Sequence, residues 1–129
     1  SAILAGAAVL AASAASAQDI TGDAAAGEKV FRKCKACHDI EGKNKVGPNL
    51  WALMTRTRGQ HEGFSYSSAM ADLGGTWSYE DLDAFIAKPK DFLSGTKMAF
   101  AGIKKATDRA DLLAYMRTLH DSPPPLPQQ

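Results

Sequence analysis

Apolar side chains recur at every third or fourth position in three stretches of the chain, and this spacing predicts three amphipathic helices. The first stretch follows Asp23, a residue type that caps helix N-termini, and it runs into the cysteines. Its apolar positions are Ala26, Val30, Phe31 and Cys34. Because little of the remaining sequence is typical of a strand, we predict an all-α fold.

The second and third helices have start and stop signals of their own. Ser78 precedes two acidic residues, which is a capping arrangement, and Pro89 ends the helix that follows. The third helix begins at Thr107 and Asp108 and is ended by residues 123–125, which are all Pro. The apolar positions of these helices are Leu82, Phe85 and Ile86 in the second, and Leu112, Tyr115, Met116 and Leu119 in the third.

The segments outside these helices are rich in loop-forming residues. Residues 42–47 and 56–63 predict loops with short helices between them, and residues 122–129 predict an exposed, extended Pro-rich tail. Three helices make a thin core for the roughly 112 residues that follow position 17, because a small chain buries a smaller fraction of its surface. We therefore expect another group to fill the centre.

The N-terminal segment predicts export. Residues 1–17 carry no charge, are mostly Ala and end in Ala15-Ser16-Ala17 before a polar stretch. Signal peptidase requires small residues at the last and third-last positions, so we predict a signal peptide cut after Ala17. A short membrane anchor is the alternative, since about 17 residues is the shortest length that spans a bilayer. In both cases the domain at residues 18–121 lies outside the cytoplasm.

The chain has 129 residues, of which 45% are hydrophobic and 22% charged, and this composition fits a single soluble domain. Lys and Arg number 15 against 14 for Asp and Glu, so the chain has no basic surplus that would indicate nucleic-acid binding. A charged partner must therefore recognise a local patch.

Both cysteines of the chain belong to one motif, Cys34-Lys35-Ala36-Cys37-His38, which is the haem attachment motif. Its two thiols add to the vinyl groups of a porphyrin, and the adjacent imidazole ligates the iron. On a helix, the three-residue step places both sulfur atoms on one side, and the next residue aims its imidazole under the ring. The motif therefore predicts one covalently bound haem c.

Three other interpretations of the motif are weaker. A zinc site would need two more ligands, and His61 and His120, which we interpret as surface groups, stand alone in the sequence. A thioredoxin-like redox pair would follow a buried strand, whereas a charged helix precedes this pair. A disulfide across two intervening residues would close too small a loop to stabilise the chain much.

Several further segments carry a family resemblance. They are Gly27-Glu28-Lys29-Val30-Phe31, Gly47-Pro48-Asn49-Leu50, Gly63-Phe64-Ser65-Tyr66, Trp77 and Gly95-Thr96-Lys97-Met98-Ala99-Phe100-Ala101-Gly102. With the Cys34 to His38 motif, and in this order, they make the chain resemble a class I c-type cytochrome, close to the mitochondrial and alphaproteobacterial carriers. The resemblance implies three main helices, short helices and long loops wrapped around one haem. It also implies that Gly27 and Phe31 pack against Leu112 and Tyr115.

The second axial ligand of the iron must be found among four methionines, Met54, Met70, Met98 and Met116. Met98 lies outside any amphipathic helix, and the family motif places the axial thioether there, so we predict His38 and Met98 as the iron ligands. The other three have ordinary apolar settings. The resemblance also implies that the Pro48 carbonyl accepts the Nδ1 hydrogen of His38. With both axial positions filled, the iron moves electrons and binds no substrate.

Other site residues follow from the same resemblance. Arg56, Tyr66 and Trp77 are expected near the haem propionates, because buried carboxylates need cations or hydrogen-bond donors. Thr96 is expected to bond an inner propionate or an internal water.

Two positions depart from the family pattern. Phe85 stands where a Tyr often lies beside the axial sulfur, and Ser94 stands where a Pro is common. The first departure implies a shifted potential or a looser Met ligand. The second implies a less rigid loop, in which Lys90 or Lys97 could replace the axial ligand at alkaline pH.

Lysines provide the argument for a partner. The positions that ring the exposed haem edge in the family are Lys33, Lys45, Lys90, Lys97, Lys104 and Lys105. Acidic residues gather at Asp19, Asp23, Glu28, Asp108, Asp111 and Asp121. This asymmetry predicts a transient, charge-steered interface with membrane redox complexes.

The sequence therefore predicts a periplasmic, monomeric, mono-haem electron carrier that is not an enzyme. The proteins it resembles accept an electron from a cytochrome bc complex and pass it to a terminal oxidase, a photosynthetic reaction centre or a periplasmic reductase. One alternative is a haem peroxidase or gas-binding protein, which needs an open coordination position. Another is an interaction module without haem.

Overall fold

Helices joined by long loops form the part of the chain that the structure describes, a computed structural model covering Gly6 and residues 22–126. In chain order they are α1 (Ala24–Lys35), the 3-10 turn η1 (Leu53–Thr55), α2 (Ser68–Ala71), α3 (Tyr79–Ala87), α4 (Pro89–Phe92) and α5 (Ala106–Arg117). No strand forms within these residues, although an isolated antiparallel bridge joins Thr57 to Thr76. The predicted all-α fold is confirmed.

The start signals of α1 and α3 act as predicted. A carboxylate oxygen of Asp23 accepts a hydrogen bond of 2.9 Å from a backbone N–H in the first turn of α1. Ser78 Oγ accepts one of 3.0 Å from the backbone of Asp81 in α3. Helix α5 begins at Ala106, one residue before the predicted start, and the residue at its N-cap makes no side-chain capping bond.

Proline positions mark the helix ends less simply than predicted. α3 ends at Ala87 as expected, but Pro89 also begins α4, because the first helical position needs no N–H donor. α5 ends at Arg117, well before the prolines that follow it. Its last turn is closed by the Thr118 N–H, which donates to backbone carbonyls of that turn.

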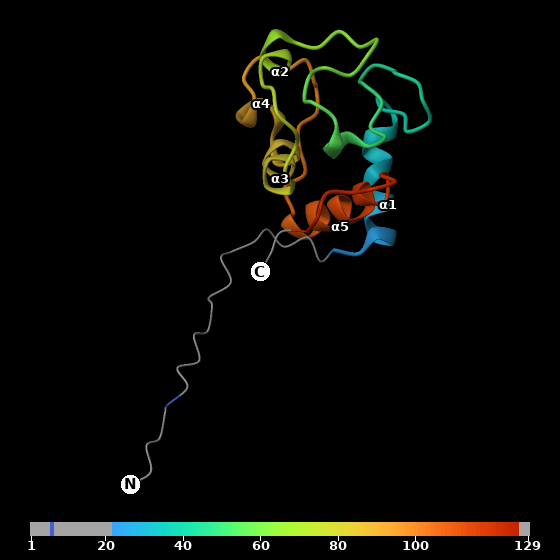
Figure 1. Cartoon of the computed structure of the whole chain (residues 1–129), viewed down its shortest axis with the longest axis vertical. Helices are drawn as coiled ribbons and strands as arrows, with labels where there is room; N and C mark the ends of the chain where they lie inside the picture. The colour runs from blue at the N-terminus through green and yellow to red at the C-terminus, as the bar shows by residue number, and fades with distance from the viewer. Residues whose placement is uncertain (1–5, 7–21, 127–129) are drawn as a thin grey trace.

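Helices α1 and α5 cross at one end of the molecule, with α3 beside α5 and the loops at the other end (Figure 1). Gly27 lies at the crossing, where an added Cβ would overlap the carbonyl oxygen of Asp111 and lie 2.9 Å from Tyr115 Cβ. The rings of Phe31 and Tyr115 pack with centroids 5.2 Å apart, and Leu112 is fully buried. The implied packing of these residues is therefore present.

The Pro-rich tail is exposed only in part, whereas the sequence predicted an exposed tail. The Tyr79 hydroxyl donates to the carbonyl of Pro124 (2.8 Å) and accepts from Arg117 Nε (2.9 Å). Pro123 and Pro124 are half-buried, whereas Pro125 is exposed. A buried hydroxyl needs a partner, and this tail carbonyl supplies it.

His120 is buried, and the prediction of a surface group is wrong. Its side chain is 8% exposed. Nε2 accepts a 3.0 Å hydrogen bond from the Met54 backbone N–H, and Nδ1 donates to the Met116 carbonyl at 3.0 Å. The imidazole thereby joins η1 to α5, a contact between segments far apart in the sequence. His61, also predicted at the surface, is half-buried.

Among the residues that the structure describes, no helix has both the length and the apolar character needed to cross a bilayer. The predicted signal peptide or anchor at residues 1–17 lies, apart from Gly6, outside the described residues. So do Asp19 and the last three residues of the tail.

Candidate cofactor site

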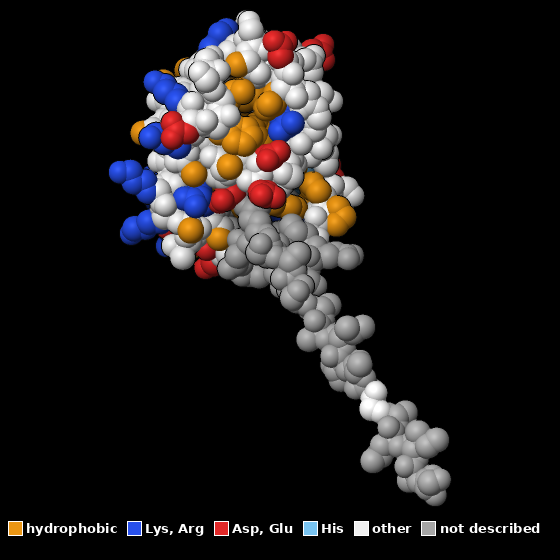
Figure 2. All heavy atoms as spheres, turned by 90° about the vertical axis from the view of Figure 1, so that its left-hand side faces the viewer, with side chains coloured by type: hydrophobic (Ala, Val, Ile, Leu, Met, Phe, Trp, Pro, Cys, Tyr) orange, Lys and Arg blue, Asp and Glu red, His pale blue; other side chains and the backbone are white. Residues whose placement is uncertain are grey.

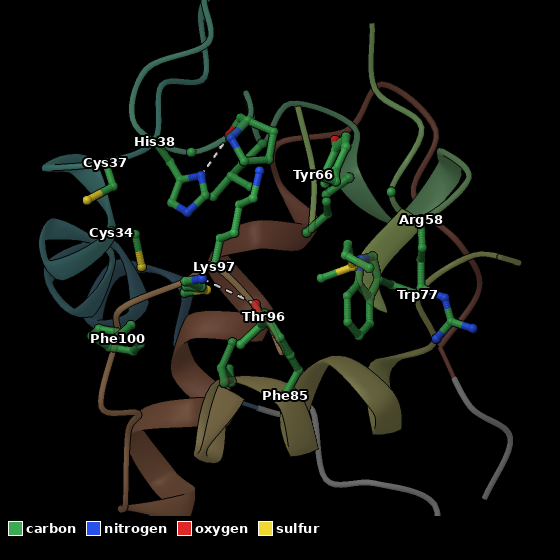
Figure 3. Close-up of a pocket in the computed structure, with 18 of the residues that line it drawn as sticks. Cys34, Cys37, His38, Arg58, Tyr66, Trp77, Phe85, Thr96, Lys97 and Phe100 are labelled. Carbon is green, nitrogen blue, oxygen red and sulfur yellow. Dashed lines mark hydrogen bonds between the residues drawn. The ribbon is translucent and has the colours of Figure 1, made fainter. Parts of the chain in front are cut away.

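A cavity of about 290 Å³ opens between the end of α1, the loop around η1, α3 and the loop that follows α4. All the residues predicted to bind a cofactor line it: Cys34, Cys37, His38, Pro48, Arg56, Tyr66, Trp77, Thr96 and Met98. Cys34, Cys37 and His38 approach from one side, and Tyr66, Trp77 and Arg58 from the other (Figure 3). Most of the other lining side chains are apolar, which suits a flat hydrophobic group.

The end of α1 brings the two thiols and the imidazole together. The backbone N–H groups of Cys37 and His38 both donate to the carbonyl of Cys34, at 3.1 and 2.9 Å, which closes a tight turn. Burial raises the pKa of the Cys34 thiol to about 11, so it is protonated at neutral pH. A thiol of this kind is a poor redox nucleophile, which argues against the thioredoxin-like interpretation. The described residues also contain no group of His, Cys, Asp and Glu side chains able to hold a zinc ion.

His38 is held in one tautomer. Its Nδ1 lies 2.7 Å from the Pro48 carbonyl oxygen, and because a carbonyl only accepts, Nδ1 carries the hydrogen. Burial lowers the pKa of His38, so the ring is neutral and Nε2 keeps a free lone pair. Gly47 makes room for the ring, since a Cβ there would overlap His38. A neutral imidazole with one nitrogen anchored is the form that ligates iron.

The loop after α4 supplies Met98. Gly95 turns the chain at a φ of 89°, a left-handed conformation that favours glycine. Thr96 Oγ1 then accepts a 3.3 Å hydrogen bond from the Met98 backbone N–H. Met70 and Met116 also line the cavity, whereas Met54 does not. The structure therefore narrows the thioethers at the site to three, and the choice of Met98 stays a prediction.

The polar side of the cavity is built around Arg56. Its Nη1 donates to the Trp51 carbonyl (3.1 Å) and its Nη2 to the Asn49 carbonyl (2.7 Å). Nε is buried and has no partner within the described residues. Because buried donors are almost always satisfied, this N–H indicates that a bound group supplies an acceptor here, and a carboxylate fits.

Tyr66 offers a second donor on this side. Its hydroxyl oxygen accepts from the His61 backbone N–H at 3.2 Å, which leaves the hydroxyl hydrogen free to donate. Burial raises the pKa of Tyr66, so the hydroxyl keeps that hydrogen. Trp77, 5% exposed, completes the wall.

Sequence reasoning missed two polar residues near this wall. Arg58 lines the cavity with its guanidinium carbon 5.2 Å from the centroid of the Trp77 ring. Asn49, 3% exposed, accepts from the Trp51 backbone N–H (2.8 Å) and donates to the Lys43 carbonyl (3.1 Å), which shapes the loop that Arg56 bonds. The sequence shows Arg58 only two positions after Arg56, which was a signal that it could lie near the same wall. The sequence does not show in which direction a long side chain points.

Phe85, the departure from the family pattern in the second predicted helix, lies in the cavity wall. Its side chain is buried in the cavity wall and packs on Trp77 and Phe92, with ring centroids 5.1 and 5.9 Å away. The wall is therefore apolar where a tyrosine would place a hydroxyl.

Comparison with known proteins agrees with this site. The family model described as Cytochrome c matches residues 24–120. A "Cytochrome c homolog" of Bradyrhizobium diazoefficiens is 49% identical over 104 residues, which are 78% of this chain and 56% of that protein. "Cytochrome c-type cyt cy" of Rhodobacter capsulatus is 52% identical over 101 residues, 78% of this chain and 51% of that protein. The chain thus spans about half the length of these two relatives.

A solved structure, "cytochrome cH from Methylobacterium extorquens", is also similar. It superposes with a TM-score of 0.72 and 45% sequence identity, over 75% of this chain and 99% of that one.

Proposed function

The chain belongs to the cytochrome c family, and from that premise we propose that it is a periplasmic electron carrier with one haem c. Members of this family hold the haem covalently, and the residues around the cavity fit that group. The observation that carries the proposal is the neutral His38, anchored to Pro48, in the same apolar cavity as two thiols and a thioether. When bound, the haem supplies a reversible one-electron change at its iron.

We assign the attachment and ligation to four side chains. Cys34 and Cys37 would form the two thioether bonds, and His38 Nε2 would ligate the iron from the same side. Met98 would supply the second iron ligand from its loop. A site closed by imidazole and thioether leaves no position for a substrate, so the protein is a carrier and not an enzyme.

Donors on the polar side of the cavity would hold the propionates. The free Nε–H of Arg56 and the hydroxyl of Tyr66 are the first candidates, and Trp77 and Thr96 are the others. Each donor replaces a hydrogen bond that a buried carboxylate would otherwise lose.

Exposed lysines support docking to membrane redox complexes. All six lysines predicted to ring the haem edge are exposed, and Lys33 and Lys97 also line the cavity. On the face shown in Figure 2, several Lys and Arg side chains lie along one edge, and hydrophobic side chains gather nearer the centre. Such a surface favours fast, salt-sensitive docking to an acidic partner.

The partner class in this proposal is a cytochrome bc complex as donor and a terminal oxidase, reaction centre or periplasmic reductase as acceptor. The protein would act as a monomer. Residues 18–121 would form the cytochrome domain and residues 122–129 its Pro-rich tail, while residues 1–17 would direct export as a cleaved signal peptide or a short anchor.

Spectroscopy of the purified, matured protein tests the proposal. We expect a c-type absorption spectrum from haem that survives acid extraction, and a near-infrared sulfur-to-iron charge-transfer band in the oxidised form. Met98→Ala should abolish that band, whereas Met70→Ala, a matched change at another thioether of the cavity, should keep it. A band that survives Met98→Ala would show that another methionine is the ligand.

The alternative function has its own test. A haem peroxidase or gas-binding protein needs a ligand position that opens readily. Stable binding of carbon monoxide by the reduced wild-type protein would therefore favour that alternative, and resistance to it favours the carrier.

A further inference from the structure

Arg58 is a second arginine in the cavity wall, and its position is fixed at several atoms. Its backbone N–H donates to the Gly75 carbonyl (2.8 Å) and its Nε to the Gly74 carbonyl (2.6 Å). The guanidinium lies over the ring of Trp77, 5.2 Å from the centroid (Figure 3). Stacking on an indole and bonding to a carbonyl leave little freedom to a side chain that is usually mobile.

The ion pair that Arg58 makes is asymmetric. Its Nη1 lies 3.3 Å from Asp81 Oδ2, but the Arg58 side chain is only 13% exposed, against 46% for Asp81. Water screens the carboxylate more than the guanidinium, because the effective dielectric constant falls with burial. The pair therefore presents a net positive potential to the cavity, although its formal charge is zero.

We propose that Arg58 is a potential-setting residue, whose charge stabilises the reduced protein while Asp81 partly offsets it. The proposal rests on the proposed function, since it requires an iron that changes charge inside this cavity. A nearby cation makes the loss of an electron less favourable, and a nearby anion makes it more favourable. Arg58 acts through the electrostatic field of its charge, which is held against the ring of Trp77, and not through a bond to the iron.

A second ion pair provides a matched control. Arg109 Nε lies 2.8 Å from Asp83 Oδ1, with side chains 15% and 30% exposed, so its geometry resembles that of the Arg58 pair. Neither Arg109 nor Asp83 lines the cavity. Breaking this pair should lower stability as breaking the first does, without the same effect on the potential.

The experiment compares single variants of the holoprotein, Arg58→Gln, Asp81→Asn, Arg109→Gln and Asp83→Asn. Each is measured by spectroelectrochemical titration and by thermal unfolding of the oxidised form. At a fixed solution potential, Arg58→Gln should raise the ratio of oxidised to reduced protein at least twofold. For a one-electron couple, in which a tenfold change corresponds to about 59 mV, this is a fall in midpoint potential of about 18 mV. Asp81→Asn should shift the midpoint in the opposite direction, and both variants should lose thermal stability.

A lysine variant separates charge from contacts. Arg58→Lys keeps the charge but loses the planar guanidinium group. The midpoint potential of this variant should therefore differ less from the wild-type value than the midpoint potential of Arg58→Gln does. Its thermal stability should still fall. Shifts of the same sign in Arg58→Gln and Asp81→Asn, or shifts as large in the Arg109 pair, would overturn the inference. Failure of the proposed function gives a different result, because the wild-type protein would then show no haem couple to titrate.

Discussion

Replacing the buried His120 should make the stability of the protein less dependent on pH. The imidazole accepts a hydrogen bond from the Met54 N–H and donates one to the Met116 carbonyl, so it holds η1 against α5. Arg56, which contributes the unsatisfied donor of the cavity, follows Met54 by two residues. His120 therefore positions the segment that carries this arginine.

The size of the effect follows from the hydrogen bond to Met54. His120→Leu leaves that buried N–H without an acceptor, which costs about 1–3 kcal/mol of unfolding free energy. For a domain of this size, each 1 kcal/mol lowers Tm by about 4–8 °C. His120→Gln places an amide oxygen within reach of the same N–H, and so it should retain most of the stability at neutral pH.

The pH dependence has a definite sign. Burial lowers the pKa of His120 in the folded protein, and the arginines at 56 and 117 oppose a positive charge there as well. The unfolded chain keeps a pKa of about 6.5, so between the two values it binds more protons than the folded protein. The stabilisation is fully present above about pH 6.5 and is lost as the pH falls towards the folded pKa, by at most about 1.4 kcal/mol per pH unit.

Thermal unfolding of the holoprotein between pH 4.5 and 7.5 measures this difference. The slope of Tm against pH should be steeper in the wild type than in His120→Gln. The protection factor of the Met54 amide in the reduced protein, its exchange rate relative to that of an unfolded chain at the same pH, should decrease as the pH falls. That of the Gly47 amide, bonded to the Cys37 carbonyl at 2.7 Å, should not. Equal slopes in the wild type and His120→Gln would refute the reasoning.

Two further predictions concern the helix crossing and the docking surface. Gly27→Ala should destabilise the protein by about 1–3 kcal/mol, because the added Cβ would overlap the carbonyl of Asp111 in α5. Ala25→Val, on the exposed side of α1, should change the free energy of unfolding little, and denaturant unfolding of both variants checks this. The rate of association with an acidic redox partner, followed by stopped flow, should fall as ionic strength rises, and Lys97→Gln at the cavity mouth should flatten that dependence; a rate independent of salt would contradict charge steering.

The helices could be predicted from local chemistry because their ends are marked locally. Asp23 and Ser78 cap α1 and α3 with their own side chains, and the apolar spacing fixes which face is buried. α5 lacks such a cap, and there the predicted start was one residue late. α4 was not predicted at all, since Pro89 was taken only as an end and not as a first helical residue.

The residues of the site also divide into those that a local sequence pattern predicts and those that depend on tertiary packing. Cys34, Cys37 and His38 are close in sequence, so their spacing alone indicates the chemistry. The bond from Arg58 to the Gly74 carbonyl and the bond from the Met54 N–H to His120 join residues 16 and 66 positions apart in sequence, and no local pattern encodes them. Whether a long or polar side chain points inward depends on how the loops close, and this is decided by tertiary packing.

The thin core expected from the sequence has a physical counterpart in the cavity wall. Leu82, Phe85 and Ile86 of α3, and Leu112 and Met116 of α5, are buried core residues that also line the cavity. Filling the cavity with an apolar ring extends their contacts, so binding of the group and stability of the fold are linked. A substitution at any of these residues should therefore change thermal stability and the haem environment together. The Arg109–Asp83 pair, which lies outside the wall, should change stability alone, and this contrast separates packing from the electrostatics of the site.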